Sequence, residues 1–226
     1  VYLENASVHV EDTDFIYTGI IARENYGTIS RCMIYDSFVH QSVGTKSYVG
    51  GIVGKNHSGA SVEVCGILNT KYTSAAGIPT TTPLAGMVGI NDGDMFACYT
   101  YNATVSGGTD YNHGVTTGGS GKVRYCYHDV VFGSYDGNVE TNPFIFKTIN
   151  FNNGALADIV NEAYGDDIDY WFQNLDNGLP VDEAPVPLSN SINTVYYVDV
   201  GKYTNMEVSS ITVSPESVAL RIGNTA

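Results

Sequence analysis

Acidic and basic side chains are the residues of this chain that could do chemistry. Asp92 and Asp94 share one short turn, and Lys122 and Arg124 follow in the next glycine-rich stretch. Further carboxylates lie at Asp110, Asp129 and Asp136. Clustered aspartates can bind calcium, and a lysine or arginine beside them can abstract a proton from a substrate. The interpretation that we favour is simpler, with Asp92 in an ordinary turn and the other charges solvated at the edges of strands.

The signatures of common enzymes are missing from the sequence. There is no Ser-His-Asp or nucleophile-elbow pattern, and no short Cys-x-x-Cys or paired-histidine motif that would bind zinc. The histidines occupy unrelated positions: His9, His40, His57, His113 and His128. We therefore expect no catalytic residue, no metal and no cofactor.

Tyrosine is abundant, with 17 residues. Exposed tyrosine beside Asp or Asn is typical of surfaces that bind sugars or proteins, because a flat ring gives contact area at low entropic cost. Tyrosine also packs inside strands, and both interpretations remain open here. The candidates for ligand binding are Asp92, Asp94, Tyr99, Tyr101, Asp110 and Tyr111.

These candidates belong to a sequence that repeats. Four stretches begin with Gly, continue with apolar residues and a turn, and close on Cys: GIIARENYGTISRC from Gly19, GIVGKNHSGASVEVC from Gly51, GMVGINDGDMFAC from Gly86 and GVTTGGSGKVRYC from Gly114. The leading glycines are 32, 35 and 28 residues apart. Such periods indicate a repeat architecture, and the short β-branched runs broken by glycines predict strands and turns. We predict an all-β fold, a parallel β-helix or solenoid of about four to five coils, with two or three strands in each coil.

The string G-I-V-G-x-N-x-x-G with its trailing Cys resembles the GLUG motif of bacterial secreted and surface proteins. The resemblance spans Gly19 to Cys126, although the copies are imperfect. Asn25, Asn56 and Asn91 occupy the turn in three copies, and the fourth has glycine there. The resemblance implies an extracellular or cell-surface bacterial protein, and it implies no particular ligand.

The four cysteines hold the same position in the four copies: Cys32, Cys65, Cys98 and Cys126. In stacked coils they would form a column at the spacing of parallel strands, about 4.8 Å per coil. Cysteine is among the most buried residue types, so we expect four free, inward-facing thiols. An even number of cysteines in an extracellular protein also permits disulfides.

Composition narrows the function classes further. The formal net charge is -14, with only 10 Lys and Arg among 226 residues. Nucleic acid and acidic membrane surfaces need clustered basic residues, so neither is expected as a partner. No apolar run is long enough to cross a membrane. The chain starts at Val1 without an initiator Met or a signal-peptide pattern, and we interpret it as a trimmed or mature segment.

Two stretches inside the repeats are predicted to be loops, and a helix is predicted after them. The loops are Thr70 to Pro83, with its prolines and threonines, and the glycine-rich Gly107 to Gly121. The helix lies in NNGALADIVNEAYG, with Asn152 or Asn153 as N-cap, Asp158 near its positive end and Gly165 as its stop. Its apolar face comprises Leu156, Ile159, Val160 and Ala163. We expect this helix to close the open end of the last coil, with Trp171 in the structural segment that follows.

The predicted organisation is a repeat domain at 1–150, a capping helix and linker at 151–190, and a β-rich tail at 191–226. The tail sequence SSITVSPESVALRIGNTA resembles the opening strands of a bacterial Ig-like (group 2) domain, which implies further domains in the same polypeptide. Two functions stay open. The first is a non-catalytic, adhesin-like surface module that presents loops to a glycan or a host protein. The second is a carbohydrate-active β-helix enzyme of the polysaccharide lyase or glycoside hydrolase type.

Overall fold

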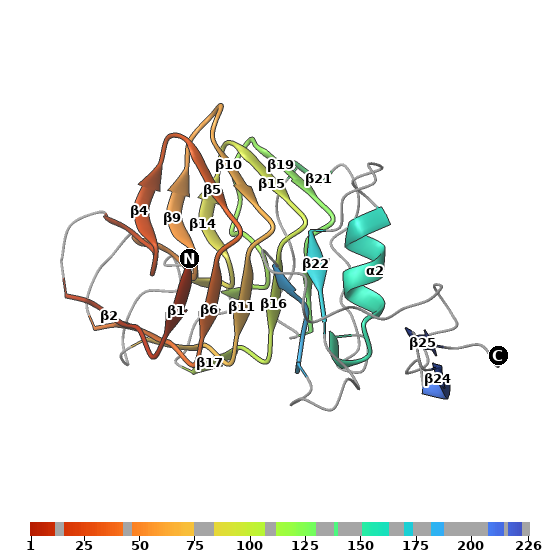
Figure 1. The fold of residues 1–226 in the computed structure, drawn as a ribbon. Coiled ribbons are helices and arrows are strands. Elements are labelled where there is room, and N and C mark those ends of the chain that lie inside the picture. The colour runs from red at the N-terminus through yellow and green to blue at the C-terminus, as the bar shows by residue number, and fades with distance from the viewer. Residues whose placement is uncertain are drawn as a thin grey trace. The chain divides into compact units, whose positions relative to one another are not determined.

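The computed structural model describes most of the chain up to residue 129 and separate segments after it (Figure 1). The described residues are 1–11, 16–42, 47–74, 84–106, 112–129, 138–139, 151–162, 170–173, 182–187, 208–214 and 217–222. The chain divides into two compact units, Val1–Thr148 and Ile149–Ala226. Each unit is described by itself.

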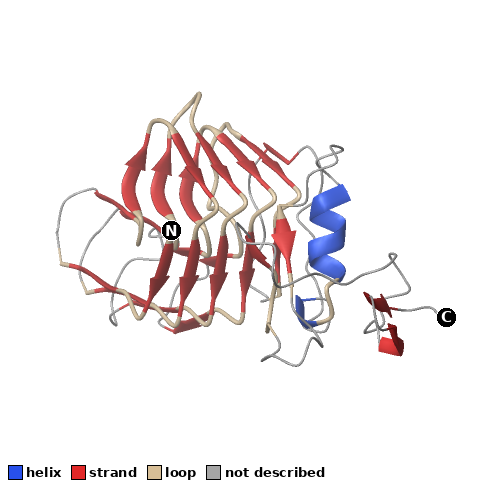
Figure 2. Ribbon diagram, viewed as in Figure 1, coloured by secondary structure: helices blue, strands red, loops and turns tan. Residues whose placement is uncertain are grey.

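The first unit is all-β, and its strands form five sheets in which every pair is parallel (Figures 1 and 2). Sheet A contains β1 (Tyr2–Glu4), β6 (Met33–Tyr35), β11 (Gly66–Leu68), β16 (Tyr99–Tyr101) and β20 (Tyr127–His128). Sheet B contains β2 (Ser7–Val10), β7 (Phe38–Gln41), β12 (Lys71–Ser74) and β17 (Thr104–Ser106). Sheet C contains β3 (Ile16–Thr18), β8 (Ser47–Gly50), β13 (Leu84–Ala85) and β18 (Asn112–His113). Sheet D contains β4 (Ala22–Asn25), β9 (Val53–Asn56) and β14 (Val88–Asn91). Sheet E contains β5 (Thr28–Ser30), β10 (Ser61–Glu63), β15 (Asp94–Phe96), β19 (Lys122–Arg124) and β21 (Asn138–Val139).

The chain visits the five sheets in the order A to E and then returns to sheet A beside its previous strand. We call one such circuit a pass, so that β1 to β5 form the first pass and β6 to β10 the second. Equivalent residues of successive passes pair directly, as Leu3, Ile34 and Ile67 do in sheet A. The expectation of two or three strands per repeat is therefore wrong, because each of the first three passes contains five short strands.

The strands are short because the backbone turns sharply at two corners of every pass. Between sheets A and B a residue with positive φ ends the strand, and this position holds Asn5, Asp36, Asn69 and Asn102. Asn and Asp tolerate the left-handed conformation better than other residues with a side chain. The positive φ of Asp36 thus separates β6 from β7.

The second corner lies between sheets E and A, directly before each cysteine. Here Arg31, Val64, Ala97 and Tyr125 adopt positive φ, although none of these residue types favours it. The left-handed conformation costs roughly 1–2 kcal/mol for such a residue. The backbone N–H of Val64 donates to the Phe96 carbonyl of the next pass at 3.0 Å. The N–H groups of Arg31 and Ala97 likewise each donate to a carbonyl of the pass that follows their own. Pairing between passes therefore outweighs the local preference.

A ladder of buried asparagines joins the ends of the sheet D strands. Asn25 pairs in register with Asn56, and Asn56 with Asn91. The Nδ2 of Asn25 donates to Oδ1 of Asn56 at 2.8 Å, and Nδ2 of Asn56 donates to Oδ1 of Asn91 at 2.8 Å. The same nitrogens also bond to main-chain carbonyls at the start of sheet E, those of Ser61 and Asp94. The sequence placed these asparagines in an ordinary turn, whereas the structure turns their side chains inward.

The fourth copy ends this ladder. Gly119 follows the sheet D register as the neighbour of Asn91, and its φ is +121°. A Cβ there would overlap the backbone of Asn91. Asn91 instead donates from Nδ2 to the Lys122 carbonyl at 3.2 Å. Glycine at this position thus has a physical reason, since the backbone approaches too closely for asparagine.

The leading glycines of the copies are in register for the last three copies only. Gly51 lies beside Gly86, and Gly86 beside Gly114, so closely that a Cβ on Gly51 or Gly86 would overlap the neighbouring carbonyl. Gly19 is displaced by one residue, because Thr18 pairs with Val49 and the next pair joins Gly19 to Gly50. The first copy has one more residue than the others between its glycine and its ladder asparagine.

Both predicted loops contain regular structure. Lys71–Ser74 forms β12, and Tyr72 is buried in a core cluster with Val39, Val49 and Leu84. The Tyr72 hydroxyl donates to the Gly86 carbonyl at 2.8 Å. In the second predicted loop Asn112–His113 forms β18, and Val115 and Thr116 are buried. The loop prediction is wrong for these segments, while residues 75–83 and 107–111 lie outside the described part.

The cysteines form the expected inward column. All four are buried and free, and backbone hydrogen bonds join them pass to pass, from Gly66 N to Cys32 O and from Tyr99 N to Cys65 O. Each Sγ donates to the carbonyl two residues earlier, at 3.2 Å for Cys65 and Cys98. The thiol thereby satisfies a carbonyl at the strained corner. Burial raises the pKa of Cys98 well above its ordinary value.

The second unit contains the predicted helix, α2 (Ala155–Glu162). Asn153 caps it, since its Oδ1 accepts a hydrogen bond from Ala155 N at 3.0 Å. Leu156 and Val160 are buried as predicted, and Ile159 is partly exposed. Ala163 and Gly165 lie outside the described residues. Whether α2 covers the last pass of the first unit stays a prediction.

A partly buried amide, that of Asn161, fixes the strand that follows α2. Asn161 accepts hydrogen bonds from the backbone N–H groups of Tyr170 and Trp171 and donates to the Trp171 carbonyl at 2.8 Å. Trp171 is fully buried, as expected of a structural residue. Its strand β22 (Trp171–Phe172) pairs antiparallel with β23 (Val186–Pro187). In the predicted tail, β24 (Val208–Ser214) and β25 (Ser217–Ile222) form an antiparallel hairpin.

We predict that Asn56→Ala lowers the free energy of unfolding by about 3 kcal/mol, because it leaves several buried polar groups without partners. Urea unfolding measures the change. Asn102→Gly is the matched control, since its side chain bonds to Asn69 at an exposed position and glycine keeps the left-handed backbone. We expect the control to lose less than about 1 kcal/mol. Equal losses would contradict a special role for the buried ladder.

We predict that stability falls at alkaline pH partly through the thiols. A Cys98 thiol has an ordinary pKa of 9.0 when unfolded and a raised one when folded, so its stabilisation is complete below pH 9.0 and is lost as pH rises above it. Between its unfolded and its folded pKa, each such thiol lowers the free energy of unfolding by about 1.4 kcal/mol per pH unit. Urea unfolding as pH rises above 9.0 measures the slope, and Cys98→Ala should reduce it by one thiol's share. An unchanged slope would show that Cys98 ionises equally well in the folded protein.

Candidate functional site

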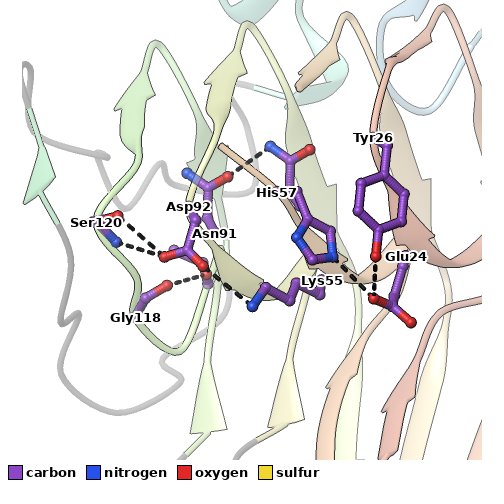
Figure 3. A network of polar contacts seen from close by, with 10 residues as sticks. Glu24, Tyr26, Lys55, His57, Asn91, Asp92, Gly118 and Ser120 are labelled. Atoms are coloured by element: carbon purple, nitrogen blue, oxygen red, sulfur yellow. Dashed lines mark hydrogen bonds and ion pairs between the residues drawn. The ribbon is translucent and has the colours of Figure 1, made fainter. Parts of the chain in front are cut away.

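The asparagine ladder determines which residues reach the surface beside it. Side chains alternate along a strand, so the residue before each inward asparagine points outward, and the residue after it lies in the turn that follows the strand. In the first three passes these flanking residues include charged and aromatic side chains. We call the set of Glu24, Tyr26, Lys55, His57, Asp92 and Ser120 the ladder strip (Figure 3).

One end of the strip is a stacked ring pair bonded to a carboxylate. The Tyr26 and His57 rings lie 4.0 Å apart with 14° between their planes. Oε2 of Glu24 accepts hydrogen bonds from the Tyr26 hydroxyl and from His57 Nε2, both at 2.9 Å (Figure 3). The guanidinium of Arg23 approaches the other oxygen, with Nε 3.4 Å from Oε1. The Tyr26 ring is thus held at its face and at its hydroxyl, and the residue remains 73% exposed.

The other end of the strip is an ion pair anchored to the fourth copy. Lys55 Nζ lies 3.5 Å from Asp92 Oδ2, and Asp92 Oδ1 accepts hydrogen bonds from the backbone N–H and the hydroxyl of Ser120, both at 3.1 Å. Lys55 also lies over the ring of Tyr17, 5.3 Å from its centroid. Tyr17 in turn stacks on Tyr48 of the next pass. Contacts of Tyr17, Lys55, Asp92 and Ser120 therefore link the first pass to the fourth.

Both carboxylates of the strip are stabilised in their charged forms. The hydrogen bond from His57, followed by that from Tyr26, lowers the pKa of Glu24. Partial burial acts to raise the pKa of Asp92, but the hydrogen bonds from Ser120 and the charge of Lys55 outweigh it and lower this pKa. A general acid needs a raised pKa and a proton to give. These two groups suit the recognition of hydrogen-bond donors better than proton transfer.

The structure separates the residues that the sequence grouped as ligand-binding candidates. Asp92 belongs to the ladder strip, and Asp94 is exposed at the start of β15. Tyr99 and Tyr101 are buried in sheet A, so they are core residues. Asp110 and Tyr111 lie outside the described residues, as does Asp136.

Among the acidic and basic candidates for catalysis, Asp94 and Lys122 are exposed register partners at the starts of β15 and β19, whereas Asp129 and Arg124 make separate contacts. Asp129 is half-buried and accepts a hydrogen bond from the backbone N–H of Asn102 at 2.9 Å, next to the corner between sheets A and B. Burial raises its pKa. Arg124 lies over the Phe96 ring on sheet E, 5.2 Å from its centroid. Within the described ranges, no group of three or more His, Cys, Asp or Glu side chains is placed to hold a metal ion.

Tyr26 and His57 were missed from the sequence, although a signal was present. Each is the residue directly after a ladder asparagine, and Asp92 and Ser120 hold the same position in the later copies. An alignment anchored on the asparagines would have put these four side chains in one column.

The statement that the histidines are unrelated was wrong for two of them. His9 pairs in register with His40 in sheet B, and both rings pack near Phe38. His40 also bonds to the Thr73 hydroxyl at 2.6 Å. This second aromatic cluster lies on another sheet than the ladder strip.

Comparison with protein-family models, with curated proteins and with solved structures finds no match to this chain. The resemblance to GLUG repeats therefore rests on the sequence motifs alone. In the part of the chain that the structure describes, no helix has the length and apolar character needed to cross a membrane.

We predict that His57→Phe raises the pKa of Glu24 back toward its ordinary value of 4.5, because phenylalanine keeps an aromatic ring but removes the hydrogen bond that lowers this pKa most. Carboxyl NMR titration measures it. The stabilisation from Glu24 is present above pH 4.5 and is lost as pH falls through the lowered pKa of the folded protein. Tyr26→Phe is the comparison and should raise the pKa less. If Tyr26→Phe raised the pKa of Glu24 more than His57→Phe did, the bond from Tyr26 would be the stronger cause of the lowered pKa, which contradicts the prediction.

Proposed function

We propose that this chain is a non-catalytic binding module of a secreted or cell-surface bacterial protein, and that the ladder strip binds a glycan or a surface protein. In this proposal the first unit is a parallel β-helix of GLUG-type repeats that serves as a rigid scaffold. In this proposal the same polypeptide contains further domains.

The scaffold part of the proposal is supported by the order of the sheets. Five parallel sheets visited in constant order, with equivalent residues paired pass after pass, are the pairing pattern that a β-helix requires. The copies at Gly51, Gly86 and Gly114 keep that register. A scaffold of this kind fixes the position of its surface residues, which reduces the entropy lost when a ligand binds.

The binding part rests on one observation above all. The charged groups of the ladder strip are already paired with one another, and an aromatic ring is held rigidly beside them. A pre-organised surface of this kind favours recognition. Catalysis of glycoside cleavage would instead need a carboxyl with a raised pKa facing a second carboxylate across the substrate. Glu24 and Asp92 have lowered pKa values, so they support the binding proposal over the enzyme alternative.

The test screens the full chain against a glycan array and a panel of purified extracellular glycoproteins, and assays it in parallel for turnover of polysaccharides and glycosides. The double variant Lys55→Met with Asp92→Asn removes the ion pair without changing the net charge. We expect the parent to bind at least one ligand and the double variant to bind it at least tenfold more weakly. His9→Ala in sheet B is the control and should bind like the parent.

Three results would overturn the proposal. The first is the absence of binding to every glycan and protein tested. The second is binding that the double variant leaves unchanged, which would move the site away from the strip. The third is turnover of a substrate that is lost in Asp92→Asn with Asp94→Asn, which would favour the carbohydrate-active enzyme.

A further inference from the structure

We infer that the exposed face of the Tyr26 ring, edged by Arg23 and Glu24, is a subsite for one neutral pyranose ring of a glycan. The inference rests on the proposed function, because it names the ligand class that one end of the ladder strip takes. The subsite consists of Arg23 and Glu24 of β4 and of Tyr26, which directly follows this strand. His57 of the second pass supports it from behind the Tyr26 ring.

The Tyr26 ring forms a rigid platform. His57 covers one face of the Tyr26 ring at 4.0 Å and nearly parallel to it, while Tyr26 as a whole is 73% exposed. The exposure therefore belongs to the opposite face and the edge of the ring. A single exposed tyrosine usually samples several rotamers, but here the hydroxyl is bonded to Glu24 and the ring is stacked. Binding would not need to order this side chain, so little entropy is lost.

The groups around the Tyr26 ring match the chemistry of a sugar. A pyranose ring presents axial C–H bonds on its face and hydroxyl groups around its edge. An aromatic face carries partial negative charge and attracts such C–H groups. Glu24 offers Oε1 as an acceptor for sugar hydroxyls, since Oε2 already accepts the bonds from Tyr26 and His57. Nε of Arg23 lies 3.4 Å from Oε1 of Glu24, and the Arg23 side chain is 64% exposed, so the guanidinium can offer further N–H groups as donors.

The charges around the ring favour a neutral ligand. The rim carries one cation and one anion, and the chain as a whole has a formal net charge of -14. Anionic sugars such as uronates would be repelled by this field. A neutral sugar satisfies both rim groups without that repulsion, and this selects neutral pyranoses as the ligand class.

The experiment titrates the full chain with methyl glycosides of glucose, galactose, mannose and N-acetylglucosamine, and with methyl glucuronide, observed by NMR at the ring protons of Tyr26 and His57. We expect at least one neutral glycoside to shift these signals in a saturable way and the glucuronide to bind at least tenfold more weakly. Tyr26→Ala should lose at least tenfold in affinity, while Tyr26→Phe, which keeps the platform, should lose only a few-fold. Tyr2→Ala is the matched control, because Tyr2 is also exposed and stacked, on Tyr35.

Each other outcome overturns the inference and is separable from a failure of the proposed function. If Tyr26→Ala binds neutral glycosides as the parent does, the subsite is elsewhere and the binding module stands. If the parent binds a protein but no sugar, the ligand class is wrong and the module again stands. Preference for the glucuronide overturns the charge argument. Failure to bind any sugar or protein overturns both proposals.

Discussion

The buried amide ladder of Asn25, Asn56 and Asn91 is the interaction on which the rest of the first unit depends. Asn25 and Asn56 each donate to the next amide and to a main-chain carbonyl at the start of sheet E, so one side chain fixes both the register between passes and the corner between two sheets. Buried polar groups are costly when unpaired, which makes any other register unfavourable. Because the asparagines point inward, the residues before them point outward and the residues after them lie in the turn, so the ladder strip is a consequence of the ladder.

Stacking between passes also decides the backbone where local preference does not. Val64 and Tyr125 adopt the left-handed conformation that asparagine or glycine would accept at lower cost. They do so because the next pass supplies a carbonyl for the Val64 N–H, and because the following cysteine fills the inside of the corner. The thiol completes this arrangement with a hydrogen bond to the carbonyl two residues before it. The cysteine column is thus a packing and capping device, and its position in every copy has a structural explanation.

Part of this arrangement could be predicted from the sequence, because it depends on spacing. The equal placing of the cysteines predicted a buried column, and the apolar spacing around Leu156 predicted a helix with Asn152 or Asn153 as its cap, of which the structure shows Asn153. The number of strands in each pass was predicted incorrectly because the corners depend on contacts between passes, and these contacts leave no local signal at residues such as Val64. The candidate site failed for a related reason. Tyr99 resembles a surface tyrosine in the sequence, and only the register shows that it is buried while Tyr26 is exposed.

The most direct test of the account is native-state hydrogen exchange of the parent and of Asn56→Ala. If the ladder holds three passes together, the loss of one amide must weaken its neighbours in both directions. We predict lower protection for the amides of His57 and Asp92, which bond to the carbonyls of Asn25 and Asn56, and along β4, β9 and β14 together. The amides of sheet B, which contains no ladder residue, should lose no more protection than the change in the global free energy of unfolding accounts for. Loss of protection confined to β9, or none at all, would contradict the claim that the ladder sets the register.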